Sequence, residues 1–528
     1  MKKYNYIKGL LVPIMAFVFA GCDEFIDINQ DPNNPTVPQL NLLLPATQLS
    51  IAGNFDNLND GASNVVQHRA SGTLNRYDQS GTSFQSAWLG FYTQAIPDLE
   101  TIIAAGTVQE EWGYVAVAKL QKAYLFSIMV DMWGNVPYFE AAIAPNPVFD
   151  KGEEIYDDLF LLIDEAIENM EMGFNVSSSA DLFYQGSLEN WRKFANSLKL
   201  KMYLNISKHD EARAKAGIME IIQSGIYIQD NESDFTFQFG TNTAPNARHP
   251  WYSGGYSPGR DGYMSMVIVD RLQDQDDPRL RYYIFRLNER AGLANSQTGE
   301  GYYGRYPGDG ASSPADQNTR AIVGVYPAAG LYDNGMMPSL GEDNIYLNNQ
   351  GATTGTTSNS FKIALFAEGD GTGAGILPLL TNSMMLFSRA EAALTLDTGE
   401  DAEALLVEAV IAHFDVVNSV SPGFPISEET KTGFTDRLAA QYKSLDEEGK
   451  LALVMMQKWI SLYGNGVEAY NDYRRTGYPE LEDLISPLDV FPERFYYSET
   501  ELTSNTTVIN TRDQLQRDQQ IVPVFWRK

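Results

Sequence analysis

One serine in the chain has the spacing of a catalytic nucleophile. Gly255, Ser257 and Gly259 match the G-x-S-x-G pattern, in which the serine sits on a sharp turn between a strand and a helix. That chemistry also uses the backbone N–H of the next residue to stabilise an oxyanion, and Pro258 has no N–H. No strand-turn-helix pattern surrounds the motif. We therefore interpret the segment as a Gly/Pro loop without catalytic function.

The residues that most often bind metals are scattered. The four histidines are His68, His209, His249 and His413. None forms the i, i+4 pair of a zinc-binding helix, and none has a cysteine partner. We therefore expect no zinc site.

Two aspartate-rich segments have some of the features of calcium sites. Asp27-Ile-Asn29-Gln-Asp31 begins like a calcium loop, but Pro32 stands where that loop needs Gly and Pro38 where it needs Glu. The run Asp274, Asp276 and Asp277 could hold a hard cation together with backbone carbonyls, although such a run is more often a solvated turn. We expect no cofactor, and a structural calcium ion has no further support.

Aromatic and arginine residues gather in three segments that could bind a ligand. A sugar presents C–H faces that pack on flat rings and hydroxyls that need polar partners. Glycines around the first segment lead us to expect rings that are open to solvent. The candidate contacts are Trp251, Tyr252, Tyr256 and Arg260 in the first segment, Tyr302, Tyr303 and Arg305 in the second (302–306), and Arg76, Tyr77 and Trp88 in a weaker third. For each ring, packing within a loop is the alternative.

Composition limits the class of partner. The chain has 528 residues, with 38 Lys and Arg against 68 Asp and Glu, which gives a net charge of −30. Such a surface repels phosphate backbones, so we expect no nucleic-acid binding. The aromatic content of 12%, with 29 Tyr, exceeds what a helical core needs and favours a ligand-binding or partner-binding surface.

The N-terminus has the pattern of an export signal. Lys2, Lys3 and Lys8 precede a short apolar run that ends in Gly21-Cys22. Residues 1–21 are therefore predicted to be a lipoprotein signal peptide, with Cys22 as the acylated residue. An ordinary signal peptide is the alternative, but it would leave a lone reactive thiol in a secreted chain. No later segment is long and apolar enough to span a bilayer.

The remaining chain divides into a tether and one body. We expect 22–45 to be an acylated, extended tether because Pro32, Pro35 and Pro38 oppose helix formation. Residues 46–528 are expected to form a single body. Within it, the range 226–377 is rich in Gly, Tyr, Asn, Ser and Thr and is predicted to be a loop-rich insert with short strands such as 235–239.

Apolar spacing predicts that helices dominate both flanks of this insert. Helices are expected over 112–132, which is apolar nearly all round and should be buried, and over 155–170, which is amphipathic. The pattern of 191–206 predicts a third, with Lys193, Lys199 and Lys201 turned outward. The further predicted helices are 212–223, ended by Gly225, and 379–396, 402–417 and 446–463.

The C-terminal stretch from Gln457 to Pro479, which includes Trp459, Tyr463-Gly-Asn-Gly466 and Arg474-Arg475, resembles a signature of SusD/RagB-like outer-membrane lipoproteins. Segments in the same order strengthen the resemblance: 131–138, 191–199, 277–280, Arg389-Ala-Glu391 and 494–497. We expect most of these residues to be structural, with Glu391 meeting an Arg or a helix N-terminus. Asp23-Glu24 looks like the acidic export tag of some surface lipoproteins.

The resemblance implies a mainly α fold, with tetratricopeptide-type helical hairpins, a loop-rich irregular second half and a few short strands. It implies a non-catalytic protein, anchored in the outer membrane through an N-terminal lipid and facing the cell exterior. Such a protein captures an oligosaccharide or a peptide and passes it, as a lid, to a SusC-like TonB-dependent transporter. Two other functions stay open at this point: a surface glycan-degrading hydrolase, and a helical-repeat scaffold for other proteins.

Overall fold

The computed structural model describes residues 38–72, 74–255, 263–285, 302, 304–309, 322–330, 373–421, 423 and 425–527. Two α-helical groups flank the middle of the chain. The first group is α2 (Leu40–Val65), η1 (Leu74–Arg76), α3 (Gln85–Gly90), η2 (Phe91–Ala95), α4 (Ile96–Gln109), α5 (Trp112–Trp133), α6 (Gly152–Met172), α7 (Leu188–Asn205), η3 (Ile206–Lys208) and α8 (Glu211–Ser224). The second group is α13 (Asn382–Leu396), α14 (Ala402–Val420), α15 (Glu428–Ser444), α16 (Glu447–Ser461), α17 (Gly466–Thr476), α18 (Glu499–Ser504) and α19 (Arg512–Ile521).

Short elements connect the two groups. They are η4 (Asn231–Ser233), β1 (Phe235–Phe239), α9 (Pro250–Gly255), α10 (Met266–Asp274), α11 (Leu280–Tyr283), β2 (Ile284–Phe285), β3 (Ile322–Val323) and β4 (Gly375–Leu380). Antiparallel pairing joins β1 to β4 and β2 to β3. The β1–β4 pair brings together the two ends of the predicted insert. The strand predicted at 235–239 is confirmed, and the predicted helix at 379–396 starts only at Asn382 because β4 runs to Leu380.

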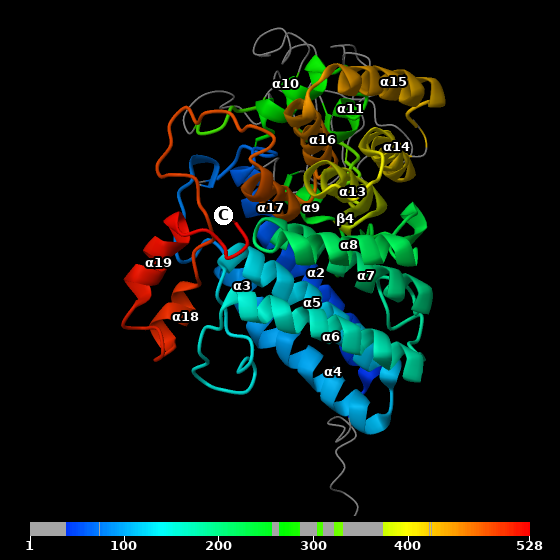
Figure 1. Cartoon of the computed structure of the whole chain (residues 1–528). Helices are drawn as coiled ribbons and strands as arrows, with labels where there is room; N and C mark the ends of the chain where they lie inside the picture. The colour runs from blue at the N-terminus through cyan, green and yellow to red at the C-terminus, as the bar shows by residue number, and fades with distance from the viewer. Residues whose placement is uncertain are drawn as a thin grey trace, which may run out of the picture.

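Consecutive helices pack side by side in pairs, which Figure 1 shows as a stack running from α4 through α8. The predicted burial of α5 is confirmed, since it lies between α4 and α6 and also contacts α2, α7 and α17. Helix α6 is amphipathic, with Ile155, Leu159 and Ile163 inside and Asp157 exposed. Short connections return α5 along α4 and α8 along α7, as expected for helical hairpins, whereas the longer segments 134–151 and 173–187 precede α6 and α7.

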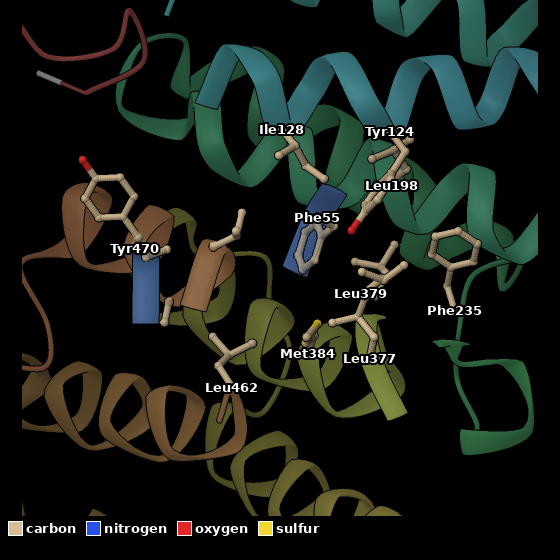
Figure 2. Packing of buried hydrophobic residues seen from close by; sticks show 14 of the residues in the cluster. Phe55, Tyr124, Ile128, Leu198, Phe235, Leu377, Leu379, Met384, Leu462 and Tyr470 are labelled. Carbon is tan, nitrogen blue, oxygen red and sulfur yellow. The ribbon is translucent and has the colours of Figure 1, made fainter. Parts of the chain in front are cut away.

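The two groups share one apolar core. Phe55 of α2, Ile128 of α5 and Leu198 of α7 meet Leu379 of β4 and Met384 of α13 in it (Figure 2). All five side chains are buried. Burial of each such side chain contributes roughly 1.5 to 3 kcal/mol, so this shared core joins both flanks into one body.

Helix ends follow the local chemistry of the sequence. Ser187, Asp210 and Asp401 accept backbone N–H bonds at the starts of α7, α8 and α14. Gly225, with φ +65°, ends α8 as predicted, and Gly464, with φ +104°, separates α16 from α17. Among the described residues, no helix is long and apolar enough to cross a membrane.

Two expectations about the helical flanks are wrong. The sequence predicts that the extended tether reaches residue 45, but α2 begins at Leu40 and contains Pro45. Leu40 and Leu44 are buried, and this burial outweighs the cost of a proline in the second turn. Lys201 does not face outward: it is buried, with Nζ 3.2 Å from Asp131 Oδ2 and 2.9 Å from Glu468 Oε1.

Candidate ligand-binding site

Backbone hydrogen bonds join four segments that are far apart in the sequence into one face. The segments are those that contain Ala70 and Arg76, Tyr263 and Met264, Arg305 and Pro307, and the loop 480–488. The carbonyl of Tyr263 accepts a bond from Ala70 N at 3.2 Å, and Arg305 N donates to Met264 O at 3.0 Å. Two further backbone bonds continue the face: Ile485 N donates to Pro307 O at 3.0 Å and Leu488 N donates to Arg76 O at 2.9 Å. The structure thus bonds the second and third predicted segments, through Pro307 and Arg76, to the 480–488 loop, and it links Tyr263 and Met264 to these two segments.

An open cavity of about 570 Å³ lies on this face. Its size falls in the range of small-molecule sites. It is lined by Val267, Asp270, Arg271, Asp274, Tyr306, Pro307, Glu482, Asp483 and Ile485. Helix α10 supplies one wall, the 304–309 segment the second and the 480–488 loop the third. Ser265 positions α10, since its hydroxyl caps the helix by accepting from Val267 N at 3.2 Å.

Tyr306 is the aromatic residue in the described lining of this cavity, and Asp270 holds it through a hydrogen bond. The Tyr306 hydroxyl donates to Asp270 Oδ2 at 2.9 Å, and both residues are half-buried. Burial, this hydrogen bond and the carboxylates of Asp270 and Glu482 raise the pKa of Tyr306 to about 12, so its hydroxyl keeps its proton. Burial, together with Asp274 and Glu482, also raises the pKa of Asp270. The ring is therefore fixed in place beside a carboxylate.

Arg271 is the one cation among the described residues that line the cavity, and it is engaged in the wall. Its Nη2 donates to Glu480 O at 2.6 Å and to Glu482 Oε1 at 3.3 Å. Its guanidinium carbon also lies 5.5 Å from the centre of the Trp459 ring. Four carboxylates line the same cavity, so its field is negative. An anionic ligand is disfavoured there.

The aromatic rings of the first predicted segment are not open to solvent. Trp251 is 4% exposed, with its ring edge to face with Tyr463 and with Arg69 4.8 Å from its centre. Tyr252 is 7% exposed and lies beside Arg248. In the second segment Tyr302 is 4% exposed. Neighbouring side chains cover these three rings. The expectation that glycines leave the rings of the first segment open to solvent is therefore wrong for Trp251 and Tyr252.

Of the three arginines predicted as contacts, the two that the structure describes remain nearer the surface. Arg305 is half-buried, with its guanidinium carbon 3.5 Å from the centre of the Tyr263 ring. Arg76 is also half-buried and donates to Ser486 O at 2.8 Å and to Ser486 Oγ at 3.1 Å. Arg76 therefore braces the loop that forms one cavity wall.

The other aromatic residues of the third segment belong to the interior. Tyr77 is 9% exposed and packs edge to face with Phe491. Trp88 is 1% exposed and contacts Trp133 and Tyr497 edge to face. Packing, the alternative given for each ring, is what the structure shows for both, because the C-terminal segment lies against them. Cys22, Tyr256, Ser257, Arg260 and Tyr303 lie outside the described residues.

The acidic half of this cavity was missed from the sequence. Tyr306 ends the predicted 302–306 segment, but Asp270, Glu482 and Asp483 were not singled out. One signal was present: Asp270 and Asp274 are four residues apart and therefore share a helix face. The contribution of the 480–488 loop had no local signal, because only the fold brings it to α10.

The described residues include no group of three or more His, Cys, Asp or Glu placed to hold a metal ion. Asp277, one of the predicted cation ligands, is instead buried in a bidentate pair with Arg279, whose Nη2 lies 2.5 Å from Oδ2. His68 and His249 are buried, and this burial lowers the pKa of each to about 3. Both imidazoles are neutral at physiological pH.

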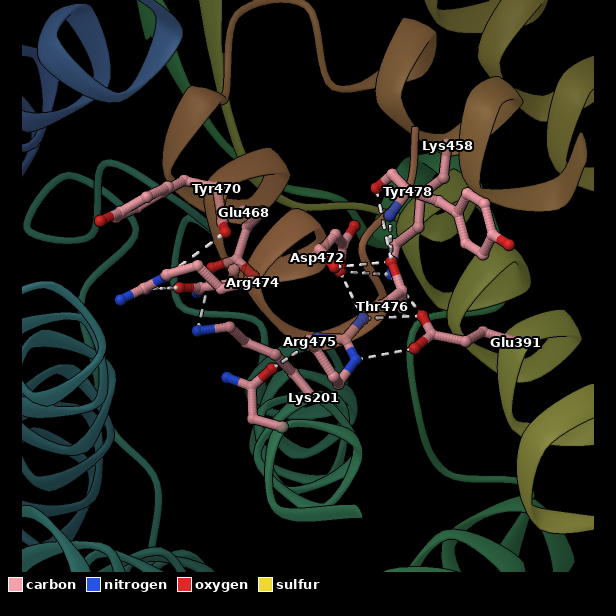
Figure 3. Close-up of polar contacts among 12 residues, drawn as sticks. Lys201, Glu391, Lys458, Glu468, Tyr470, Asp472, Arg474, Arg475, Thr476 and Tyr478 are labelled. Atoms are coloured by element: carbon pink, nitrogen blue, oxygen red, sulfur yellow. Dashed lines mark hydrogen bonds and ion pairs between the residues drawn. The ribbon is translucent and has the colours of Figure 1, made fainter. Parts of the chain in front are cut away.

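The signature residues of the C-terminal stretch build the frame and do not line this cavity. Arg475 of α17 pairs with Glu391 of α13 and with Asp472, and Lys458 of α16 contacts the same two carboxylates (Figure 3). Arg474 donates to Asp131 O at 2.7 Å. Of the two partners predicted for Glu391, an arginine or a helix N-terminus, the arginine is confirmed.

The fold and this face describe a mainly helical body with an open cavity whose described lining is mostly acidic and apolar. The SusD-like family model described as "Starch-binding associating with outer membrane" matches residues 32–498. The chain therefore belongs to the SusD-like family of outer-membrane nutrient-binding proteins, whose members are non-catalytic.

Solved structures agree with this assignment at the level of the fold. A SusD homolog from Bacteroides fragilis is 18% identical, with a TM-score of 0.69 over 93% of this chain and 99% of that one. A SusD/RagB family protein from Bacteroides thetaiotaomicron is 19% identical, with a TM-score of 0.71 over 93% and 99%. A chitin-binding SusD homolog from Flavobacterium johnsoniae is 18% identical, with a TM-score of 0.69 over 92% and 98%. No curated protein matches the chain in sequence.

Proposed function

We propose that the chain captures a neutral oligosaccharide in the Tyr306 cavity and delivers it to a transporter in the outer membrane. The observation that carries this proposal is the half-buried Tyr306 ring, fixed by Asp270 inside an open, carboxylate-lined cavity of about 570 Å³. An apolar ring face packs on the C–H face of a sugar, and carboxylate oxygens accept bonds from its hydroxyls. A peptide with a basic side chain is the alternative cargo for the same negative field.

The family supports this ligand class. Its description is starch-binding, and one similar structure is described as chitin-binding. Starch and chitin are both uncharged glycans. An uncharged ligand agrees with this cavity because Arg271, the cation in its described lining, is already bonded to Glu480 and Glu482 and is not available to pair with an anion. Of the residues singled out from the sequence, Arg76 and Arg305 remain candidates for the rim of this site.

Delivery and anchoring complete the proposal. Acylation at Cys22 would hold the protein at the outer membrane, with residues 38–527 on the exterior side. A SusC-like TonB-dependent transporter would be the partner, and the chain would act as its lid. The support for this step is the family description, which associates these proteins with the outer membrane.

Calorimetric titration of the full-length protein, purified in detergent, tests the capture step. Maltohexaose, chitohexaose and cellohexaose serve as ligands, and a lysine-containing hexapeptide tests the alternative. Tyr306→Ala should weaken glycan binding about tenfold, since loss of a stacked ring costs roughly 1 to 1.5 kcal/mol. Tyr478→Ala is the matched control, because Tyr478 also donates to a carboxylate, that of Glu448 at 2.9 Å, but does not line the cavity. Equal affinity of the Tyr306→Ala variant would place the ligand elsewhere.

A separate experiment tests the anchor and the partner. Labelled palmitate should enter the wild-type chain and not the Cys22→Ala variant, and protease added to intact cells should degrade the wild-type protein. A large β-barrel should co-purify with it. Label that persists in Cys22→Ala, or a protein shielded from protease, would contradict the surface-lipoprotein proposal.

A further inference from the structure

A second cavity, of about 540 Å³, is lined by elements other than α10 and the 480–488 loop. Four segments line it: 183–190, which leads into α7 and includes its first turn, the stretch from η4 through β1, Ile376 of β4, and the end of α14. None of its described lining residues also lines the Tyr306 cavity. The sequence offered no reason to expect a site here.

Phe183 is one of the two aromatic residues in the described lining of this second cavity. Phe183 is half-buried and stacks on Phe235, with ring centres 4.2 Å apart and planes at 30°. Phe235 covers one face of the ring, and Phe237 lies edge to face with it at 5.9 Å between ring centres. Phe183 therefore borders the cavity with a part of the ring other than the face stacked on Phe235. Phe235 is itself buried and packed against Phe194 and Tyr124, so the Phe183 ring stacks on a residue of the apolar core.

Uncharged amides line the same cavity as this ring. Gln185, Asn190 and Gln238 all line the cavity, from the segment before α7, the first turn of α7 and β1 respectively. A side-chain amide both donates and accepts hydrogen bonds, which matches a hydroxyl or an acetamido group that does the same. The side chains of Gln185 and Gln238 are exposed, so they can turn to meet a ligand.

The charged residues in the described lining of this cavity are all acidic. Asp415 is held by Lys431, whose Nζ lies 2.5 Å from Oδ1, and Glu232 is exposed. Asp234 is half-buried and accepts a bond from Asn382 N at 2.7 Å. Within that described lining there is no Lys or Arg, so phosphate, sulfate or uronate groups are disfavoured.

We propose that this cavity is a second saccharide site, which holds one neutral sugar unit between the Phe183 ring and the amides of Asn190 and Gln238. The inference rests on the proposed function for the ligand class, but it places that ligand on different elements. A glycan-binding protein with two such sites would hold a long or branched chain at two points. Its apparent affinity for a long glycan would then exceed that of either site.

Hydrogen–deuterium exchange of the full-length protein in detergent locates each site separately. Maltohexaose, chitohexaose and cellohexaose are the probes. Bound sugar at the second site should slow exchange in 183–190, 231–238 and 415–419, and it should do so in wild type and in Tyr306→Ala alike. The double variant Asn190→Leu/Gln238→Leu should lose this protection, whereas Gln223→Leu, which replaces an exposed amide on α8, should keep it. Unchanged melting temperatures would show that the variants are folded.

Each outcome separates the two proposals. Protection confined to 266–274, 304–309 and 480–485 would overturn the second site and leave the proposed function standing. Protection confined to the second set of segments would support the second site and remove the Tyr306 cavity as the binding site. Protection that persists in Asn190→Leu/Gln238→Leu would overturn the second site as described. Absence of protection with all three glycans would overturn both proposals.

Discussion

Arg475 and Glu391 form a bidentate pair across 84 residues of sequence, with Nε 2.7 Å from Oε1 and Nη2 2.7 Å from Oε2. Both side chains are 2% exposed. Burial alone would raise the pKa of Glu391, but Arg475 and Lys458 outweigh it and hold the pKa below its ordinary value. The pair ties α17 to α13, so it joins the signature stretch to the helical frame.

Removing one member of this pair should destabilise the protein strongly. Glu391→Leu leaves two buried cations short of a carboxylate, and we expect a loss of about 3 to 5 kcal/mol in the free energy of unfolding. The double variant Glu391→Leu/Arg475→Met should recover part of that loss, because it removes the unpaired charge as well. Urea unfolding followed by circular dichroism measures both. A loss below about 1 kcal/mol in the single variant would show that the pair does not hold the frame.

Asp56 should make the protein less stable as the pH rises. Burial, and then the neighbouring Asp60, raise the pKa of Asp56 from 3.8 to about 7 in the folded state. Between these two values the folded state binds a proton that the unfolded state has released, so stability falls as pH rises and the full cost is present above about pH 7.

The variant Asp56→Asn removes this titration. We expect it to raise stability by roughly 1 to 3 kcal/mol at about pH 8 and to change it little near pH 4. Thermal unfolding at the two pH values measures the difference. Asp78→Asn, which replaces a half-buried aspartate elsewhere in the chain, serves as the control. An equal effect of Asp56→Asn at both pH values would contradict the raised pKa.

Trp88 should affect stability and not ligand binding. Its ring lies between Trp133 and Tyr497 in the core, so Trp88→Ala should cost about 3 to 5 kcal/mol by leaving a cavity. Trp88→Phe should cost less. Calorimetric titration well below the melting temperature should then give a wild-type affinity for the glycan. A large loss of affinity in a folded Trp88→Phe variant would restore Trp88 as a candidate contact.

The acidic lining of the Tyr306 cavity should select against charged glycans. We expect maltohexaose to bind with an affinity that depends little on salt, and oligogalacturonate of the same length to bind weakly or not at all. The variant Asp274→Asn/Asp483→Asn should bind oligogalacturonate more tightly than wild type does, since it removes two exposed carboxylates from the cavity. Tighter binding of the uronate than of the neutral glycan by the wild-type protein would argue against a neutral ligand.

Much of this protein could be predicted from its sequence because the signals are local. Apolar spacing predicted α5 and α6, and the Gly225 cap and the strand at 235–239 also follow from neighbouring residues. The C-terminal signature indicated the family. Glu391 was predicted to meet an arginine or a helix N-terminus, because a carboxylate on an apolar helix face needs a partner, and Arg475 is that partner.

Tertiary packing decided which side chains are available to a ligand. Trp251 and Trp88 look like ligand contacts beside glycines or polar residues, yet Tyr463 and Tyr497, far along the chain, cover them. Lys201 has the spacing of a surface lysine, but α5 and α17 supply Asp131 and Glu468 as its partners. The Tyr306 cavity needs α10 beside the 480–488 loop. Burial depends on contacts between distant segments, so periodicity along one segment predicts a helix but not what lies against it.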